Sequence, residues 1–386
     1  MMKVSKLCVR EFDANKDSLK VIEMEHMSST VKTKNETSFL FDLLGDPLAR
    51  IRCFTDRIML VAVYGDEEEI VGVIRCCIKM VSVLRRKSQC SRIGYVLGLR
   101  TSPKYRRRGV GTKLVEKVEE WCRNKGAEYI YMATDRTNTA SLNLFTFKFS
   151  YVKFRSLSIL VRPVHAHRLP LSEATIIPLP PSIAVPLYTR VFASVEFFPN
   201  EDIAAILSSP FTLGTFLAVP RRSGKQTSSG FAMMSVWNSK DVFRIQVKGI
   251  SMVHRKVLGL VRAADERFPW LRIPSVPDLS TKFGVYFMYG LYMEGKVGAR
   301  LMTSLCNFAH NMAREDDGCA AVVTEVGRMD PMKSAVSHWK SMSFDEDVWC
   351  VKWLGDKTPN PSVLHHLDWI KSQPSNDVIF VDPRDF

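Results

Sequence analysis

The stretch Arg106-Arg107-Arg108-Gly109-Val110-Gly111 decides the fold class of this chain, because of what lies on either side of it. A β-rich run, residues 92–101, precedes it, and an amphipathic helix is predicted directly after it. The first amides of a helix have no intrahelical partners, and the helix dipole favours an anion there. Glycines at positions 109 and 111 let the backbone approach such an anion, where a Cβ would intrude. The stretch therefore predicts a phosphate-binding turn.

The segments around this turn alternate between strand and helix patterns. Strand patterns occur at residues 6–12, 58–64, 70–81, 92–101, 127–134 and 151–161. Helix patterns occur at residues 15–27, 39–44, 110–122 and 138–145. Gly126 stands where a left-handed cap would end the third of these helices. The order predicts an α/β (α+β) fold with a mixed sheet that has helices on both faces.

Length and composition limit the class of protein. At 386 residues the chain favours two domains, since one domain commonly takes about 100–200 residues. No signal-peptide pattern opens the sequence, and no uninterrupted apolar run is long enough to span a membrane, so neither secretion nor a membrane partner is expected. The nine cysteines are odd in number and show no Cys-x-x-Cys spacing. They predict reduced, mostly buried thiols and no metal site.

The positive charge is concentrated around the predicted phosphate turn. Residues 70–115 contain twelve Lys and Arg residues and no carboxylate. Such a block is typical of a solvated face or of a nucleic-acid surface. Here three of the arginines crowd into a single turn, whereas nucleic-acid binding would spread them along a groove with interleaved aromatic residues. The pattern favours a discrete phosphate ligand over direct nucleic-acid binding.

The second half of the chain repeats features of the first half. Gly98 and Gly126 are echoed by Gly290 and Gly318 at the same offset, each pair in a similar strand or helix-end context. A cluster of prolines between residues 163 and 181 marks the boundary. We therefore expect a first domain at residues 1–165, a Pro-rich linker at 166–180, and a second, similar lobe with a C-terminal tail at 181–386. The second lobe has a shorter turn with no arginine cluster, and we expect it to lack a phosphate site.

With these residues in place, the sequence resembles the GNAT acetyltransferase family, whose signature is Arg/Gln-x-x-Gly-x-Gly. Arg106, Gly109 and Gly111 match that signature. The resemblance implies the GNAT fold, in two tandem lobes of which the second is degenerate, and acetyl-CoA as co-substrate. It implies a cofactor site formed by Leu99, Arg100, Thr101, Arg106, Arg107, Arg108, Gly109, Val110, Gly111 and Asn138.

More narrowly, four segments resemble the plant HOOKLESS-type N-acetyltransferases. They are residues 41–47, 95–100, 234–238 and 380–384, and they lie in both halves of the chain. This resemblance implies transfer of an acetyl group to a primary amine, with a histone-type lysine of a basic protein as the implied acceptor. It also implies nuclear residence, with the cytoplasm as the alternative, and a regulatory role in plant development and hormone signalling.

Two positions depart from the family pattern. Phe145 stands where many GNAT enzymes have a tyrosine that protonates the leaving thiolate, and Ser150 replaces a usual glycine. Which group takes the proton of the amine stays open: the candidates are Asp135, Glu23, Glu25 and Tyr95. The leading hypothesis is an acetyltransferase, in which water can carry that proton. The alternative is a CoA-binding adaptor or scaffold in a nuclear complex.

Overall fold

The computed structural model describes residues 7–28, 31–32, 38–65, 68–83, 90–171, 174–221, 229–355 and 378–386. Within these ranges, twelve strands form one mixed sheet in the order β1-β4-β5-β6-β7-β15-β8-β14-β13-β11-β10-β9. The first half of the chain supplies β1 (Leu7–Glu11), β4 (Arg57–Tyr64), β5 (Glu69–Ser82), β6 (Cys90–Thr101), β7 (Tyr129–Asp135) and β8 (Val152–Pro163). The second half supplies β9 (Ala174–Leu179), β10 (Thr212–Pro220), β11 (Gly230–Asn238), β13 (Gly284–Gly295), β14 (Cys319–Gly327) and β15 (Phe344–Trp353).

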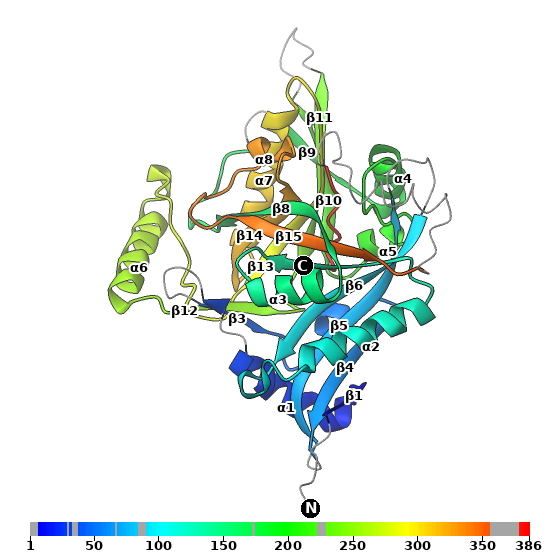
Figure 1. The fold of residues 1–386 in the computed structure, drawn as a ribbon. Helices are drawn as coiled ribbons and strands as arrows, with labels where there is room; N and C mark the ends of the chain where they lie inside the picture. Colours follow the sequence, from blue (N-terminus) through cyan, green and yellow to red (C-terminus); the bar gives the residue numbers. More distant parts are fainter. Residues whose placement is uncertain are drawn as a thin grey trace, which may run out of the picture.

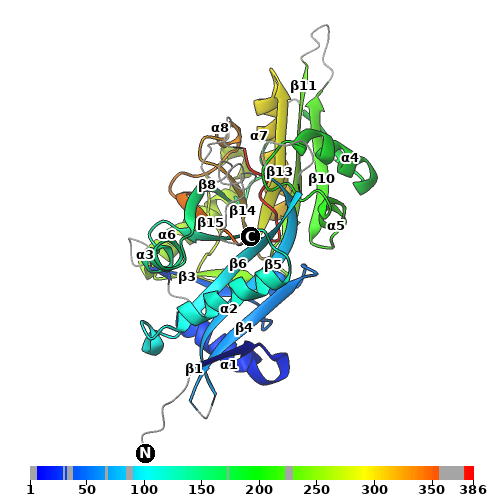
Figure 2. The same ribbon diagram turned by 45° about the vertical axis from the view of Figure 1, so that its right-hand side comes forward.

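Helices cover both faces of this sheet, with the first half at the bottom and the second at the top of Figure 1. The helices are α1 (Ala14–Ser28), α2 (Val110–Asn124), α3 (Thr139–Asn143), α4 (Pro181–Phe192), α5 (Ile203–Leu207), α6 (Met252–Arg267), α7 (Gly298–Arg314) and α8 (Met332–Ala335). α1 and α2 lie on opposite faces of β4–β6 (Figures 1 and 2), so the predicted mixed α/β class is confirmed. Val110, Leu114 and Val118 of α2 are buried, as their helical spacing predicts.

The two halves complete each other's sheet through β8 and β15. β15 lies between β7 and β8 and pairs antiparallel with both, with Val351 opposite Tyr131 and Val348 opposite Ser156. β8 in turn lies between β15 and β14. Each half therefore receives a strand from the other, and residues 1–165 do not form a self-contained sheet. The predicted domain boundary at residue 165 therefore does not separate two independent sheets.

The predicted linker at residues 166–180 is also wrong in part. Ala174–Leu179 is strand β9, which pairs antiparallel with β10 at the far edge of the sheet. Proline is tolerated on edge strands because the missing amide costs no ladder hydrogen bond there. Pro178 pairs with Phe216 in this position. The proline cluster thus marks an edge strand as well as a connection.

Two further element predictions differ from the structure. Residues 39–44 were expected to be helical, but Ser38–Asp42 is strand β3, which pairs with β12 (Arg244–Lys248) and with β2 (Val31–Lys32) in a small separate sheet. Phe39-Leu40-Phe41 is a short, continuous apolar run, which periodicity alone does not assign to a strand or a helix. Residues 151–161, expected to supply closing strands, contain the single strand β8.

The predicted repeat has clear structural counterparts. Gly98 in β6 has φ +64° and Gly290 in β13 has φ +59°, and each lies at a β-bulge where its strand has one residue more than its neighbour. Gly126 and Gly318 have φ +71° and +85°, each between a long helix and the next strand. These positions need the left-handed backbone that glycine adopts at no cost.

The cysteines behave as the sequence predicts. All nine are free thiols, and six of them are buried. Cys76 and Cys77 face opposite sides of the sheet: Cys76 lies in the core under α2 with its Sγ 3.5 Å from that of Cys122, and Cys77 lies in the core on the other face. The part of the chain that the structure describes holds no helix of the length and apolarity that a membrane crossing requires.

The last described segment, residues 378–386, lies between the two halves at the centre of the molecule (Figures 1 and 2). Ile379, Phe380 and Val381 are buried in the large core on the α1 side of the sheet. The Phe386 ring stacks on Phe287 of β13 with centroids 4.4 Å apart. The Nη2 of Arg50 donates a hydrogen bond of 2.6 Å to the backbone carbonyl of Asp385. The segment therefore connects the halves through both apolar and polar contacts.

Candidate active site

The predicted phosphate turn, residues 106–111, lies between the end of β6 and the start of α2. Gly109 is the N-cap of α2 with φ +80°, and the first helical hydrogen bond runs from the Lys113 amide to the Gly109 carbonyl at 3.0 Å. No described residue accepts a hydrogen bond from the amides of Val110, Gly111 or Thr112. These three amides and the positive end of the helix dipole are therefore available to an anion.

The arginines of the phosphate turn add exposed positive charge beside these amides. Arg106, Arg107 and Arg108 are exposed, and among the described residues no carboxylate forms an ion pair with them. A Cβ built on Gly109 meets no atom within 4 Å, whereas one on Gly111 would lie 3.3 Å from a methyl group of Leu144. The open space, the amides and the arginines fit the pyrophosphate of a CoA thioester. That this turn binds one stays a prediction.

The strands β6 and β7 separate above the turn. They pair in parallel from Ile93 with Tyr129 to Val96 with Met132, and no pairing continues beyond Val96. The bulge at Gly98 follows at once, and then come Leu99, Arg100 and Thr101, the residues predicted to hold the pantetheine arm. Burial lowers the pKa of the Arg100 side chain. The divergence leaves a polar backbone edge on β6 that an extended ligand can use.

Asn138 has a structural role in this arrangement. It is the N-cap of α3: its Oδ1 accepts a hydrogen bond of 3.2 Å from the Ser141 amide, and its Nδ2 donates to the Thr134 hydroxyl at 3.0 Å. Such a cap fixes the start of the helix. α3 in turn brings the Leu144 side chain against Gly111. Asn138 therefore supports the phosphate turn through α3.

On the α1 side of the sheet, an ion pair covers the bulge. The guanidinium of Arg75 bonds both carboxylate oxygens of Glu25, at 2.8 and 3.0 Å, and its Nε donates to the Pro47 carbonyl at 2.6 Å. A Cβ on Gly98 would lie 2.8 Å from Nη1 of Arg75. The structure therefore brings the candidate Glu25 to the bulge as the partner of an arginine. Glu23, two residues earlier on α1, is exposed, and within the described part of the chain no hydrogen bond or ion pair links it to this region.

Sequence reasoning missed Asp385, which lies in the same core. Its Oδ2 forms an ion pair with the buried Lys79 ammonium and accepts a hydrogen bond of 2.7 Å from the Tyr131 hydroxyl. The Tyr95 hydroxyl donates to its backbone carbonyl at 3.4 Å. Its second oxygen, Oδ1, is buried without a hydrogen-bond partner. Burial raises the pKa of this carboxyl. No sequence pattern links residue 385 to a strand some 300 residues earlier, so no signal could have found it.

A group of carboxylates from both halves lies on the same face. Asp135, at the end of β7, is paired directly opposite Asp347 of β15. Burial, together with the charge of Asp135, raises the pKa of Asp347 to about 6. Burial next to Asp347 and Asp385 raises the pKa of Glu325 in β14 to about 8. Asp135 was predicted, and the other two were missed because they come from the second half.

Phe145 is a packing residue in this structure. It is 1% exposed in the core under α2, and its ring meets Tyr151 edge-on at a centroid distance of 5.0 Å. It has no group that can donate a proton to a leaving thiolate. Ser150 has φ +59°, which explains why the family pattern favours glycine at that position.

In the second half, a side chain occupies the space beside the equivalent bulge, and the turn before the equivalent helix is shorter. The ring of Tyr188 from α4 lies directly on Gly290, where a Cβ would come within 2.3 Å of it, and the Tyr188 hydroxyl bonds that of Ser235 at 2.7 Å. Only Lys296 and Val297 connect β13 to α7, in place of the longer turn between β6 and α2. No described grouping of three or more His, Cys, Asp and Glu side chains is placed to hold a metal ion.

Comparisons with known proteins identify relatives over nearly the whole chain. The acetyltransferase (GNAT) family model matches residues 27–149. "Probable N-acetyltransferase HLS1" of Arabidopsis thaliana is 44% identical over 407 aligned positions, which cover 98% of this chain and 99% of that protein. "Acetyl transferase GW6a" of Oryza sativa subsp. japonica is 42% identical over 90% of this chain and 83% of its own length. The crystal structure of Saccharomyces cerevisiae N-myristoyltransferase with bound myristoyl-CoA has a TM-score of 0.53 at 8% identity, over 91% of this chain and 80% of that chain, and shows the fold alone.

Proposed function

This chain belongs to the GNAT acetyltransferase family as a HOOKLESS-type N-acetyltransferase, and from that premise we propose the substrates and the setting of its reaction. The donor is acetyl-CoA, held with its pyrophosphate at residues 106–111. The acceptor is a primary amine, and a lysine of a basic, histone-type protein fits best. The setting is a nuclear regulatory role. The observation that supports the amine most directly is the group of carboxylates beside the diverging strands.

These carboxylates suit a cationic acceptor. Asp135, Asp347, Glu325 and Asp385 come from four segments and lie on the face of the sheet opposite α2. An amine arrives as an ammonium ion, and those carboxylates of the group that are ionised attract it. It must then lose a proton before it attacks the thioester that acetyl-CoA supplies. A carboxylate with a raised pKa is a better proton acceptor at neutral pH than one with an ordinary pKa.

In this proposal the second half helps to bind the amine acceptor and does not bind acetyl-CoA. It supplies Glu325 and Asp347, while Tyr188 and the two-residue turn leave no site for a second acetyl-CoA. An adaptor that binds acetyl-CoA without turnover is the second candidate. Phe145 favours it, because this residue provides no acid for the leaving thiolate.

Release of CoA separates the two candidates. We expect the full-length protein with acetyl-CoA to release free thiol when lysine-containing basic peptides are added, and to release much less with acidic peptides of the same length. A thiol-reactive dye follows the product, and mass spectrometry locates the acetyl group on the peptide. Binding of acetyl-CoA without release of CoA, across histone peptides and small amines, would establish the adaptor.

The raised pKa of Glu325 predicts that the activity of the protein depends on pH. Activity should rise with pH as the Glu325 carboxyl loses its proton near pH 8, and Glu325→Gln should lower kcat and remove that limb of the pH profile. The exposed Glu201 provides a control, since Glu201→Gln should leave the profile unchanged.

The stability of the folded protein should fall as pH rises, which is opposite to the change in activity. The native state keeps the Glu325 proton between its ordinary pKa of 4.5 and about 8, whereas the unfolded state has lost it. The stabilisation is therefore complete at low pH and is lost as pH rises through this window. Urea unfolding of Glu325→Gln should show a smaller loss of stability over the same window. An unchanged pH profile in both measurements would exclude Glu325 as the titrating group.

A further inference from the structure

Helix α6 and the turn after it carry apolar side chains that point into solvent. Figure 1 shows the helix at the edge of the molecule, apart from the sheet, in an insertion between β12 and β13. Leu260 is 71% exposed and Trp270 is 70% exposed. The other large exposed apolar side chains here are Met252, Val253, Val257, Phe268 and Leu271. Surface helices normally turn such residues toward the core, so a contiguous exposed group marks an interaction surface.

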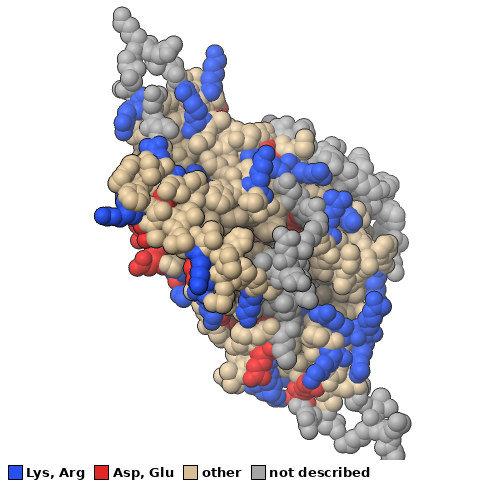
Figure 3. Space-filling model, turned by 90° about the vertical axis from the view of Figure 1, so that its left-hand side faces the viewer, with Lys and Arg blue, Asp and Glu red and all other residues tan. Residues whose placement is uncertain are grey.

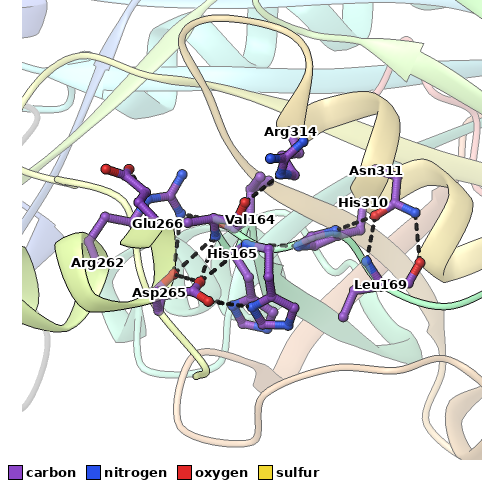
Figure 4. A network of polar contacts seen from close by, with 12 residues as sticks. Val164, His165, Leu169, Arg262, Asp265, Glu266, His310, Asn311 and Arg314 are labelled. Carbon is purple, nitrogen blue, oxygen red and sulfur yellow. Dashed lines mark hydrogen bonds and ion pairs between the residues drawn. The ribbon is translucent and has the colours of Figure 1, made fainter. Parts of the chain in front are cut away.

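Polar contacts made by Asp265 and Arg262 hold α6 to the body. Asp265 is its one buried residue, and it is fully buried. One carboxylate oxygen accepts hydrogen bonds from the Ala166 amide at 2.9 Å and the Ser275 hydroxyl at 2.6 Å. The other lies 2.7 Å from Nδ1 of His167. Figure 4 shows this network from close by, with Arg262 of the same helix bonded to the Val164 carbonyl.

The network continues into the body of the protein through the residues that follow β8. The His165 amide donates to Nε2 of His310 on α7 at 2.8 Å, and Asn311 bonds the backbone of Leu169 at 2.9 Å in both directions (Figure 4). Burial lowers the pKa of His310 to about 3, so this ring is neutral and acts as an acceptor. Buried polar networks with satisfied partners fix one arrangement. This network fixes the inward side of α6 to the body of the protein. The exposed apolar side chains of the helix therefore point toward solvent.

The charges on α6 select the kind of partner. The outer carboxylate of α6, Glu266, is paired with Arg262, and Asp278, beside the helix, is paired with Arg255. By contrast, Lys256, Arg267 and Arg272 are exposed, and within the described ranges no carboxylate forms an ion pair with them. Figure 3 shows this side of the molecule, where Lys and Arg outnumber Asp and Glu around an uncharged surface. Unpaired cations beside an apolar row are complementary to an acidic apolar surface.

The small residues on the exposed side of α6 are spaced so that a second helix can pack against them. Gly259 and Ala263 are one turn apart on the exposed side, and a Cβ on Gly259 would meet no atom within 4 Å. Small residues at this spacing leave a groove that receives the ridge of a second helix. Lys256 and Arg267 fall on the same side of the helix as Leu260, so the exposed side is not a clean apolar stripe. Insertion into a bilayer would bury these two cations, whereas a protein helix can pair them.

We propose that the outward face of α6, formed by Met252, Val253, Lys256, Val257, Leu260 and Ala263, docks an acidic amphipathic helix of a partner protein. The partner's apolar ridge packs on Val253, Val257 and Leu260. Its flanking carboxylates pair with Lys256 and Arg267. This docking is separate from acetyl transfer, because α6 contributes nothing to the phosphate turn or to the carboxylates of the acceptor side.

A synthetic peptide tests the proposal with the full-length protein. The probe is a fluorescein-labelled amphipathic helix of about five turns with a leucine ridge and glutamate flanks. A second peptide has lysine in place of every glutamate. We expect anisotropy to show binding of the acidic peptide and not of the basic one. Leu260→Ser should weaken binding about tenfold or more, since a central apolar contact of an interface commonly costs more than 1 kcal/mol.

Matched variants make the outcome decisive. Leu19→Ser changes an equally exposed leucine, 77% against 71%, on α1 and should leave peptide binding unchanged. Lys256→Glu with Arg267→Glu should reverse the preference toward the basic peptide. Acetyl-CoA affinity should be the same in all variants, which shows that they are folded. Three results would overturn the proposal: equal binding of both peptides, binding of mixed phosphatidylcholine–phosphatidylserine vesicles in place of the peptide, or self-association that Leu260→Ser abolishes.

Discussion

Replacing Gly109 with valine is expected to weaken acetyl-CoA binding on the order of 100-fold or more while the protein stays folded. Gly109 has φ +80°, and a Cβ there would meet no atom within 4 Å, so the space beside it is open. A valine there must either adopt a backbone that costs about 1–3 kcal/mol or turn the amides away from the pyrophosphate. Several charge-assisted contacts of about 1–3 kcal/mol each would then be lost together.

Gly126→Val is the matched control for this experiment. Gly126 has φ +71° and also has open space at its Cβ, but it lies at the other end of α2. Its substitution should cost similar stability without changing acetyl-CoA affinity. Isothermal titration calorimetry gives the affinities, and thermal unfolding gives the stabilities. Equal affinities of Gly109→Val and the unmodified protein would mean that acetyl-CoA does not use this turn.

Replacing Arg384 with alanine is expected to destabilise the protein by about 3–5 kcal/mol, because it leaves a buried carboxylate without its partner. Asp382 is 1% exposed, and Arg384 bonds both its oxygens, with Nη2 to Oδ2 at 2.7 Å. The same guanidinium reaches Asp202 at 2.8 Å and lies over the Phe54 ring. These contacts join the segment 378–386 to both halves of the molecule.

Two further variants show whether burial causes this loss. Arg52 pairs with Asp46 at the surface, and Arg52→Ala should cost no more than about 1 kcal/mol. The double substitution Asp382→Asn with Arg384→Met removes both charges and should cost less than Arg384→Ala alone. Urea unfolding followed by circular dichroism measures all three. A cost for Arg384→Ala as small as that for Arg52→Ala would show that water reaches Asp382.

The parts of the site that could be predicted are those set by local sequence. A strand, a glycine turn and an amphipathic helix follow one another directly at residues 92–124, so their chemistry is visible without the fold. The echo of Gly98 at Gly290 was visible for the same reason, since a left-handed bulge needs glycine in both halves. The fold class and the repeat therefore followed from short segments.

The parts that could not be predicted depend on contacts between distant segments. β8 and β15 alternate in the same way, and no local pattern tells which half each one completes. Glu325, Asp347 and Asp385 look like ordinary charged residues in the sequence, because their raised pKa values come from burial between the halves. The helix predicted at residues 39–44 failed because its partner strand, β12, lies about 200 residues later.

The exchange of β8 and β15 sets an order of events during synthesis on the ribosome. The strand that fills the gap between β7 and β8 is residues 344–353, so the half that carries the phosphate turn emerges long before the strand that closes it. Until then the edges of β7 and β8 are unpaired, and exposed edges are prone to wrong pairing. A chain that ends before residue 344 therefore lacks the strand that joins the two halves of the sheet.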